Sequence, residues 1–318
     1  LPAPPRLSHG YCASQNRVCL LVETHSLKPF TNRVYSTKSM MEHTISFVND
    51  NHREILLLNR AADKQTIKNY LVNKKKFPLV LAGNGKFDKY LFKGFEWNDE
   101  YSEITGSTVR NYSDKPIEIE IPIFNKANSL KKITVPAAYL IPKQFTQVIE
   151  VIKAHQIKFN LVKDRKRLKV EKYRFDKLQF AQRPYEGRQL PTFNTISFTE
   201  TVEVEAGTLI VYTNQRLLRV IVNLLEPEAP DSFVNWGFFN AFFERKEYAE
   251  AYVMEPYAKQ MMKNDSNLRS EFYKKLEEAE SFRNNSGERL DFFYKRSPFY
   301  DKGESVYPVM RLLNKTNI

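Results

Sequence analysis

The stretch Val18-Cys19-Leu20-Leu21-Val22 is a continuous apolar run, and a carboxylate, Glu23, follows it at once. The run is too short for a helix and rich in branched side chains, so it predicts a strand buried on both faces. Burial of an unpaired carboxylate is costly, so a Glu at this place either has a partner or faces a crevice. Ligands bind open parallel sheets in the crevice outside the carboxyl ends of the strands. Glu23 is therefore the leading candidate for a functional residue; the alternative is that it caps the next element or pairs with a nearby Arg or Lys.

The residues around this run resemble a known family. Gly10-Tyr11, Asn16-Arg17 and the stretch from Leu20 to Pro29 are similar to the last catalytic strand of a bacterial branch of the M14 zinc carboxypeptidases. In that family the glutamate that ends this strand is the general base and general acid of peptide-bond hydrolysis, so the resemblance implies this role for Glu23. Three later segments are similar to the far end of the same proteins: Leu224-Leu225-Glu226-Pro227, Asp231-Ser232 and Trp236-Gly237-Phe238-Phe239.

The same resemblance bears on a tyrosine and on the metal. M14 enzymes place a mobile Tyr near the substrate carboxylate, before the catalytic strand, which implies a substrate contact for Tyr11; the alternative is a ring packed at a domain edge. The family binds zinc through an H-x-x-E pair and a later His, all before this strand, and none of the five His residues here opens an H-x-x-E. His25, two positions after Glu23, is either a ligand or a hydrogen-bonding neighbour. The resemblance therefore implies zinc in a complete parent enzyme and no metal ligands or zinc in this chain.

The beginning of the chain fits this expectation. Leu1-Pro2-Ala3-Pro4-Pro5 lacks an initiator Met, and no signal peptide is evident. A strand buried on both faces also needs neighbours that the sixteen residues before Arg17 do not supply. We therefore expect the C-terminal portion of a secreted or periplasmic metallocarboxypeptidase that acts on a peptide substrate. Its N-terminal catalytic segment is expected to be missing, and the fragment alone is expected to be inactive.

Composition excludes several classes of protein. The chain is 42% hydrophobic and 13% aromatic, which is typical of globular domains. Its length of 318 residues predicts two or three modules. No apolar run approaches the roughly 18 residues of a membrane span, so no transmembrane segment is predicted. The net charge of +12 comes from short, separated basic runs, which argues against nucleic-acid binding. Cys19 is expected to pack in the predicted strand, and the absence of a C-x-x-C pair argues against a metal or redox role for either cysteine.

The order of patterns along the chain predicts a multi-domain α+β protein. Residues 1–73 read as the terminal strand and helices of an α/β carboxypeptidase domain, with helices at 32–49 and 53–71. Residues 74–213 read as a β-sandwich-like accessory domain with a strand-helix-strand insert at 136–162. Residues 214–318 read as a helical C-terminal region, in which the aromatic cluster at 233–243 is core rather than a sugar-binding platform.

Smaller elements follow from local signals. Asn84-Gly85 predicts a hairpin between strands at 77–81 and 90–97, because Asn-Gly supplies the positive φ values of tight turns. Further strands are expected at 103–111 and 117–124, the latter half-buried because Ile and Glu alternate along it. Strands at 168–180 and 195–212 and helices at 216–225, 248–263, 266–279 and 287–296 complete the prediction.

Two other functions compete with the carboxypeptidase. The first is a non-catalytic module on the cell surface that recognises glycan or protein through the β domain, with Glu23 in a structural role. The second is a degenerate M14 relative that has lost its metal.

Overall fold

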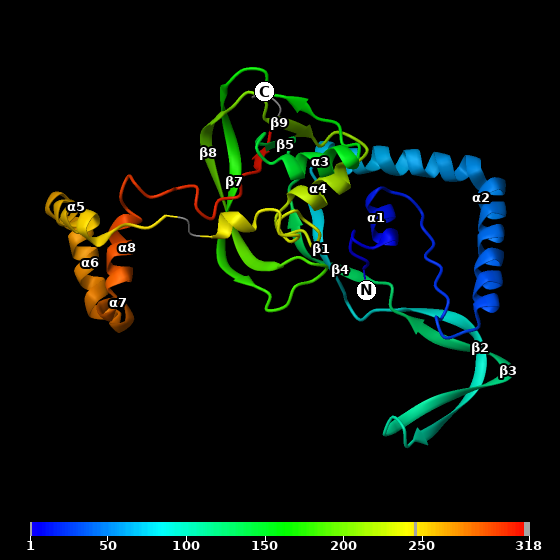
Figure 1. Ribbon diagram of the computed structural model, residues 1–318. Helices are drawn as coiled ribbons and strands as arrows, with labels where there is room; N and C mark the ends of the chain where they lie inside the picture. The colour runs from blue at the N-terminus through cyan, green and yellow to red at the C-terminus, as the bar shows by residue number, and fades with distance from the viewer. Residues whose placement is uncertain (1, 245–246, 315–318) are drawn as a thin grey trace.

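The computed structural model of the chain describes residues 2–244 and 247–314, and Figure 1 shows the arrangement of its elements. The fold is mixed α and β, consistent with the predicted α+β class. The helices are α1 (Ser8–Ser14), α2 (Phe30–Ile67) with a π-helical continuation η1 (Lys68–Val72), α3 (Thr146–Ala154), α4 (Leu218–Leu225), the 3-10 helix η2 (Asn240–Phe243), α5 (Ala251–Asn264), α6 (Ser266–Glu278), α7 (Glu280–Asn284) and α8 (Ser286–Tyr294). The strands are β1 (Phe77–Gly83), β2 (Asp88–Ser102), β3 (Ser107–Ile123), β4 (Ala127–Ile133), β5 (Ala138–Ile141), β6 (Asn160–Leu161), β7 (Lys166–Phe180), β8 (Pro191–Val204), β9 (Leu209–Tyr212) and β10 (Met310–Leu312).

The largest sheet has six strands in the order β6-β9-β5-β10-β7-β8, and every neighbouring pair is antiparallel. The predicted strand-helix-strand insert is confirmed as β5, α3 and β6. The predicted strands at 168–180 and 195–212 are confirmed as β7 and as the pair β8 and β9, joined by a turn at Gly207. Strand β10 makes the sheet's most distant pairing in sequence, because it lies between β5 and β7 but follows them by more than a hundred residues.

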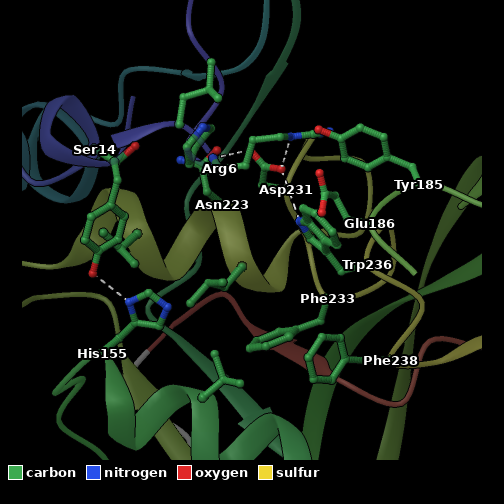
Figure 2. Close-up of a pocket in the computed structure, with 16 residues that line it drawn as sticks. Arg6, Ser14, His155, Tyr185, Glu186, Asn223, Asp231, Phe233, Trp236 and Phe238 are labelled. Carbon is green, nitrogen blue, oxygen red and sulfur yellow. Dashed lines mark hydrogen bonds and ion pairs between the residues drawn. The ribbon is translucent and has the colours of Figure 1, made fainter. Parts of the chain in front are cut away.

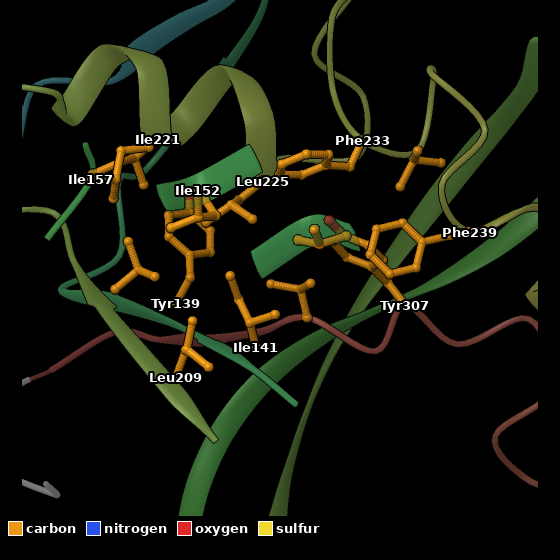
Figure 3. Close-up of a cluster of buried hydrophobic side chains, with 14 of the residues drawn as sticks. Tyr139, Ile141, Ile152, Ile157, Leu209, Ile221, Leu225, Phe233, Phe239 and Tyr307 are labelled. Carbon is orange, nitrogen blue, oxygen red and sulfur yellow. The ribbon is translucent and has the colours of Figure 1, made fainter. Parts of the chain in front are cut away.

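The main hydrophobic core lies between this sheet and helices α3 and α4, as Figure 3 shows. Helix α4 is apolar almost all round because it packs on two sides, which is the usual reason for such a helix. Leu217, Val220, Ile221 and Leu225 face the main core, whereas Leu218 and Val222 pack against β1 and β4. The aromatic residues Phe233 and Phe239 are fully buried, so the prediction that this cluster is core is confirmed there.

The predicted hairpin around Asn84-Gly85 is wrong. Strand β1 pairs with β4, and the backbone N–H of Asn84 donates to the carbonyl of Lys126 across the end of that pair. Strands β2 and β3 pair with each other instead and form a long two-stranded ribbon inserted between β1 and β4. The turn therefore leads from one strand pair into another, because its partner strand lies more than forty residues away.

The predicted buried strand at Val18–Val22 is also wrong. Residues 16–25 form neither helix nor strand, and no described strand pairs with them. Val18 is 89% exposed and Cys19 is exposed, so Cys19 does not pack as a small core residue. The cause is that a strand buried on both faces requires neighbours on both sides, and none of the described strands is placed there.

Helix α2 replaces the two predicted helices at 32–49 and 53–71 with one continuous element, whose course bends sharply in Figure 1. Many of its apolar side chains are exposed, among them Phe30, Tyr35, Ile45 and Phe47. Its second half contacts α4. The first half therefore presents an apolar surface that no other described element covers.

The C-terminal helices confirm the predictions at 248–263, 266–279 and 287–296. They share a core of their own, built on Phe272, Phe282, Phe292 and Phe293, and Figure 1 shows them set apart from the large sheet. The division into domains at 73 and 213 stays a prediction, as does the β-sandwich-like description of the middle part. No helix among the described residues is long and apolar enough to cross a membrane.

Candidate functional site

A cleft of about 560 Å³ opens where the N-terminal segment meets α3, α4 and two loops, as Figure 2 shows. One loop carries Tyr185 and Glu186, and the other carries Asp231, Trp236 and Phe238. The lining combines aromatic and aliphatic side chains with a few polar groups, which is the usual make-up of a ligand site.

The polar end of the cleft is built on Arg6. Its Nε lies 2.7 Å from Oδ1 of Asp231, and its backbone N–H donates to Oδ2 of the same carboxylate at 2.8 Å. The indole N–H of Trp236 donates to Oδ1 at 3.2 Å. The guanidinium also lies 5.5 Å from the ring centre of Tyr185 and 5.4 Å from that of Trp236, within range of a cation–π interaction. Arg6 therefore joins the N-terminal segment to both loops.

The other end holds Tyr11, the predicted substrate contact. Tyr11 lies in α1, and its Oη is 2.7 Å from Nδ1 of His155, the residue that follows α3. Burial raises the pKa of Tyr11 and lowers the pKa of His155, so both groups are held in their neutral forms. The two atoms share one hydrogen bond, in which the phenol donates to Nδ1 in one imidazole tautomer and Nδ1–H donates to the phenol oxygen in the other. Tyr11 also packs against the main core, as the domain-edge alternative expects, while still lining the cleft.

Glu23 lies elsewhere. It is exposed, does not line the cleft, and makes no hydrogen bond or ion pair with another described residue. The structure therefore does not bring Glu23 and Tyr11 together. His25 is exposed too, and its Nδ1 accepts a hydrogen bond from the backbone N–H of Leu27 at 3.2 Å, which is a local turn contact rather than a shared site with Glu23.

The chain just before the Glu23 segment is firmly anchored. The guanidinium of Arg17 binds both carboxylate oxygens of Asp63 in α2, at 3.1 and 2.9 Å, and the side chain of Asn16 donates to the same carboxylate at 3.1 Å. Burial acts to raise the pKa of Asp63, but these hydrogen bonds outweigh it, so the pKa of Asp63 is lowered. The segment that carries Glu23 is therefore fixed at its N-terminal end, where Asn16 and Arg17 bind Asp63.

The described residues do not fit a zinc site. No three His, Cys, Asp or Glu side chains in residues 2–244 and 247–314 are grouped so that they could hold a metal ion. Neither Glu23 nor His25 belongs to such a group, and His155 is engaged with Tyr11.

Sequence reasoning missed the most buried acidic side chain among residues 2–244 and 247–314. Glu226 is 1% exposed and follows α4 directly. Tyr139 donates to its Oε1 at 2.6 Å, Tyr173 donates to its Oε2 at 3.0 Å, and Nε of Arg311 lies 3.0 Å from Oε1. Burial raises the pKa of Glu226, and the charge of Arg311 opposes that effect. We expected a carboxylate that follows a buried apolar element to need a partner, and applied this to Glu23. The structure shows such a carboxylate at Glu226, with Tyr139, Tyr173 and Arg311 as its partners.

Comparison with known proteins gives a partial match. No family model matches the sequence, and no solved structure is significantly similar to it. Carboxypeptidase 2 of Trichophyton equinum is 33% identical over 107 residues, which make up 32% of this chain and 19% of that protein. The match thus spans about a fifth of the length of this relative. It suggests a carboxypeptidase-like relationship over that part of the chain.

Proposed function

We propose that this chain is the C-terminal part of a zinc-dependent metallocarboxypeptidase that hydrolyses peptide bonds near a substrate C-terminus, with Glu23 as the general base and acid. The resemblance around Glu23 and the partial similarity to a carboxypeptidase support the proposal. A secreted or periplasmic location belongs to the same proposal.

The observation that carries the proposal is the exposed apolar run that ends at Glu23. Val18, Leu20 and Leu21 are largely in solvent, and the first half of α2 adds further exposed apolar side chains. A soluble protein rarely leaves so large an apolar surface uncovered, so a patch of this kind marks an interaction site. Five consecutive apolar residues suit a strand that enters a parallel sheet, with Glu23 at its carboxyl end.

Glu23 has the freedom that proton transfer requires. Its carboxylate is committed to no described partner, so it can take a proton from an attacking water and pass it to the leaving amine. The described residues form no zinc site, so in this proposal the metal ligands come from polypeptide outside them. Residues 1–73 would then complete a catalytic domain rather than form one.

The test is Glu23→Gln in the full-length protein. We expect kcat/KM for peptide hydrolysis to fall by about 10²- to 10⁴-fold, because a positioned acid–base group contributes roughly this factor. Zinc content and KM should stay close to those of the unaltered protein, because Glu23 is proposed to be neither a ligand nor a binding group. Glu54→Gln is the matched control, because Glu54 is also an exposed carboxylate but lies in α2. It should leave kcat/KM, KM and the zinc content unchanged. Near-normal turnover of Glu23→Gln would refute the assignment.

The cleft favours a second candidate, the non-catalytic binding module. The rings of Tyr185 and Trp236 lie beside the Arg6–Asp231 pair and, unlike the core residues Phe233 and Phe239, are not fully buried. They suit recognition of a glycan or a peptide side chain, with Glu23 uninvolved. In this case the chain alone should bind saturably to members of a glycan or peptide array, and Trp236→Ala should abolish the binding. Trp97→Ala, an aromatic truncation in β2 and outside the cleft, should not. Activity of the full-length protein that depends on Glu23, without such binding, would exclude this candidate.

A further inference from the structure

The two cysteines of the chain lie seven positions apart and belong to different local structures. Cys12 is half-buried in α1, and Cys19 is exposed in the segment that leads to Glu23. No other cysteine is present in the sequence, so an intramolecular disulfide has only this pairing.

The end of α1 turns the chain back over Cys12. Asn16 has a φ of +56°, its N–H donates to the carbonyl of Ala13 at 3.1 Å, and the N–H of Arg17 donates to the carbonyl of Cys12 at 2.9 Å. These two bonds and the left-handed residue form a Schellman motif. Cys19 follows Arg17 by two residues, a span of at most about 7 Å, so the chain can bring Cys19 to the Cα–Cα separation of roughly 4.4–6.8 Å from Cys12 that a disulfide needs.

The side chains also interact, because the neighbouring thiol of Cys12 raises the pKa of Cys19. The turn itself is held from outside by the contacts of Asn16 and Arg17 with Asp63. The proximity of the two sulfur atoms is therefore supported by a backbone motif and by anchoring to α2.

We propose that Cys12 and Cys19 form a reversible disulfide that ties the Glu23 segment to α1. The inference rests on the positions of the thiols and does not depend on the proposed function. It departs from the sequence-based expectation, because the spacing is not C-x-x-C and only the turn after α1 brings the two residues together.

The reaction needs an oxidant, and a low-molecular-weight disulfide such as oxidised glutathione supplies it. The thiolate of one cysteine attacks the small disulfide, forms a mixed disulfide and releases one small thiol. The thiolate of the other cysteine then attacks the protein sulfur of that mixed disulfide, forms the Cys12–Cys19 bond and releases the second small thiol. The protein loses two protons and two electrons, and the small disulfide gains them.

The consequence falls on the segment after Arg17. In the dithiol form, residues 18–29 run between the anchor at Asp63 and the start of α2 without a described strand partner. The disulfide adds a covalent tie four residues before Glu23. Oxidation would therefore restrict the conformations from which Glu23 and its apolar run can meet a partner surface.

The experiment equilibrates the folded chain with glutathione redox buffers, quenches it with acid and digests it with trypsin without reduction. Cleavage after Arg17 separates the two cysteines, so the disulfide joins peptide 7–17 to peptide 18–33, because trypsin does not cut between Lys28 and Pro29, and the mass of the linked pair is lower than the sum of the two by two hydrogen atoms. We expect this linked pair to be the main product. We also expect the bond to be at least about tenfold harder to reduce in the folded chain than in concentrated guanidinium chloride, because folding holds the thiols together.

Single variants provide the controls. Cys12→Ser and Cys19→Ser should each lose the linked pair and carry one glutathione on the remaining cysteine. Hydrogen exchange of residues 18–24 should slow on oxidation in the unaltered chain and not in either variant. Two glutathione adducts on the unaltered chain, disulfide-linked dimers, or equal ease of reduction in folded and denatured chains would each overturn the proposal.

Discussion

His155 shows how a single side chain fixes the N-terminal helix. Its Nδ1 is 2.7 Å from Oη of Tyr11, and this contact joins α1 to the end of α3 across the cleft. Burial of the imidazole lowers the pKa of His155 in the folded chain, so the folded state disfavours its charged form. The folded His155 therefore gains its proton at a lower pH than an exposed histidine does.

We expect the contribution of His155 to the free energy of unfolding to be complete above pH 6.5, the usual pKa of the unfolded residue, and to be lost as the pH falls through its lower folded pKa. The sign follows because the unfolded chain then binds a proton that the folded chain does not. Urea unfolding at a series of pH values will measure the slope, and His155→Gln should make it shallower. Tyr11→Phe should cost about 1 kcal/mol near pH 7 through loss of the hydrogen bond. A slope unaltered by His155→Gln would contradict this account.

Among secondary-structure elements, the β2–β3 ribbon stands alone. Tyr90 pairs with Ile121 and Phe92 with Ile119 on one face, while the other face carries ion pairs such as Lys89–Glu120. Neither face is covered by another sheet, and Figure 1 shows the ribbon projecting from the rest of the chain. An isolated two-stranded ribbon is marginally stable in water, so it contributes little to the stability of the elements at its base.

Excision of the ribbon tests this independence. Deletion of residues 86–125 would join Gly85 to Lys126 and close β1 and β4 into a short hairpin, because Asn84 already bonds to Lys126. We expect the free energy of unfolding to change by less than about 1 kcal/mol, since the deleted and retained groups share few contacts. Leu79→Ala in β1, by contrast, should cost about 2–5 kcal/mol, because Leu79 is buried against α4. A large loss on excision, measured by urea unfolding, would show that the ribbon supports the core.

These elements show what the sequence could predict. The β5-α3-β6 insert, β7 and the C-terminal helices follow from hydrophobic period and turn residues that act within a few positions. The pairing of β1 with β4 does not, because the Asn84-Gly85 signal is local and the partner strand is not. The run before Glu23 has the composition of a buried strand, but composition does not supply the neighbours that bury it. For the cleft, Tyr11 was a sequence candidate, whereas the other lining residues His155 and Arg6 come together with it only through the fold.

At the scale of the whole molecule, β10 closes the structure. It fills the gap between β5 and β7, and its Arg311 meets the buried Glu226 and contacts Glu171 and the carbonyl of Thr134. Just before it, Tyr307 is fully buried in the main core. The end of the chain therefore holds together the sheet, α4 and the core.

A chain that ends at Ser305 tests this dependence. Loss of Arg311 leaves Glu226 buried without its cation, at a cost of about 3–5 kcal/mol, and loss of the Tyr307 ring adds a similar amount. The sum approaches the entire stability of a typical domain, so we expect the large sheet to unfold. Near-UV circular dichroism should fall while helical signal from α5–α8 persists. The volume-conserving change Leu312→Met should cost less than about 1.5 kcal/mol, and a truncated chain as stable as this control would disprove the dependence.

The position of β10 also sets the order of events during synthesis. About 130 residues separate Phe180, the last residue of β7, from Met310, the first of β10. At ordinary rates of translation the ribosome needs roughly 7 to 26 seconds to cover that distance. During this interval β5 and β7 have been made, but the edge of each that later pairs with β10 is unpaired. Unpaired strand edges are surfaces through which nascent chains aggregate. This sheet therefore completes only after β10 has been made, and until then we expect its open strand edges to be a target for chaperones that shield them while α5–α8 are being made.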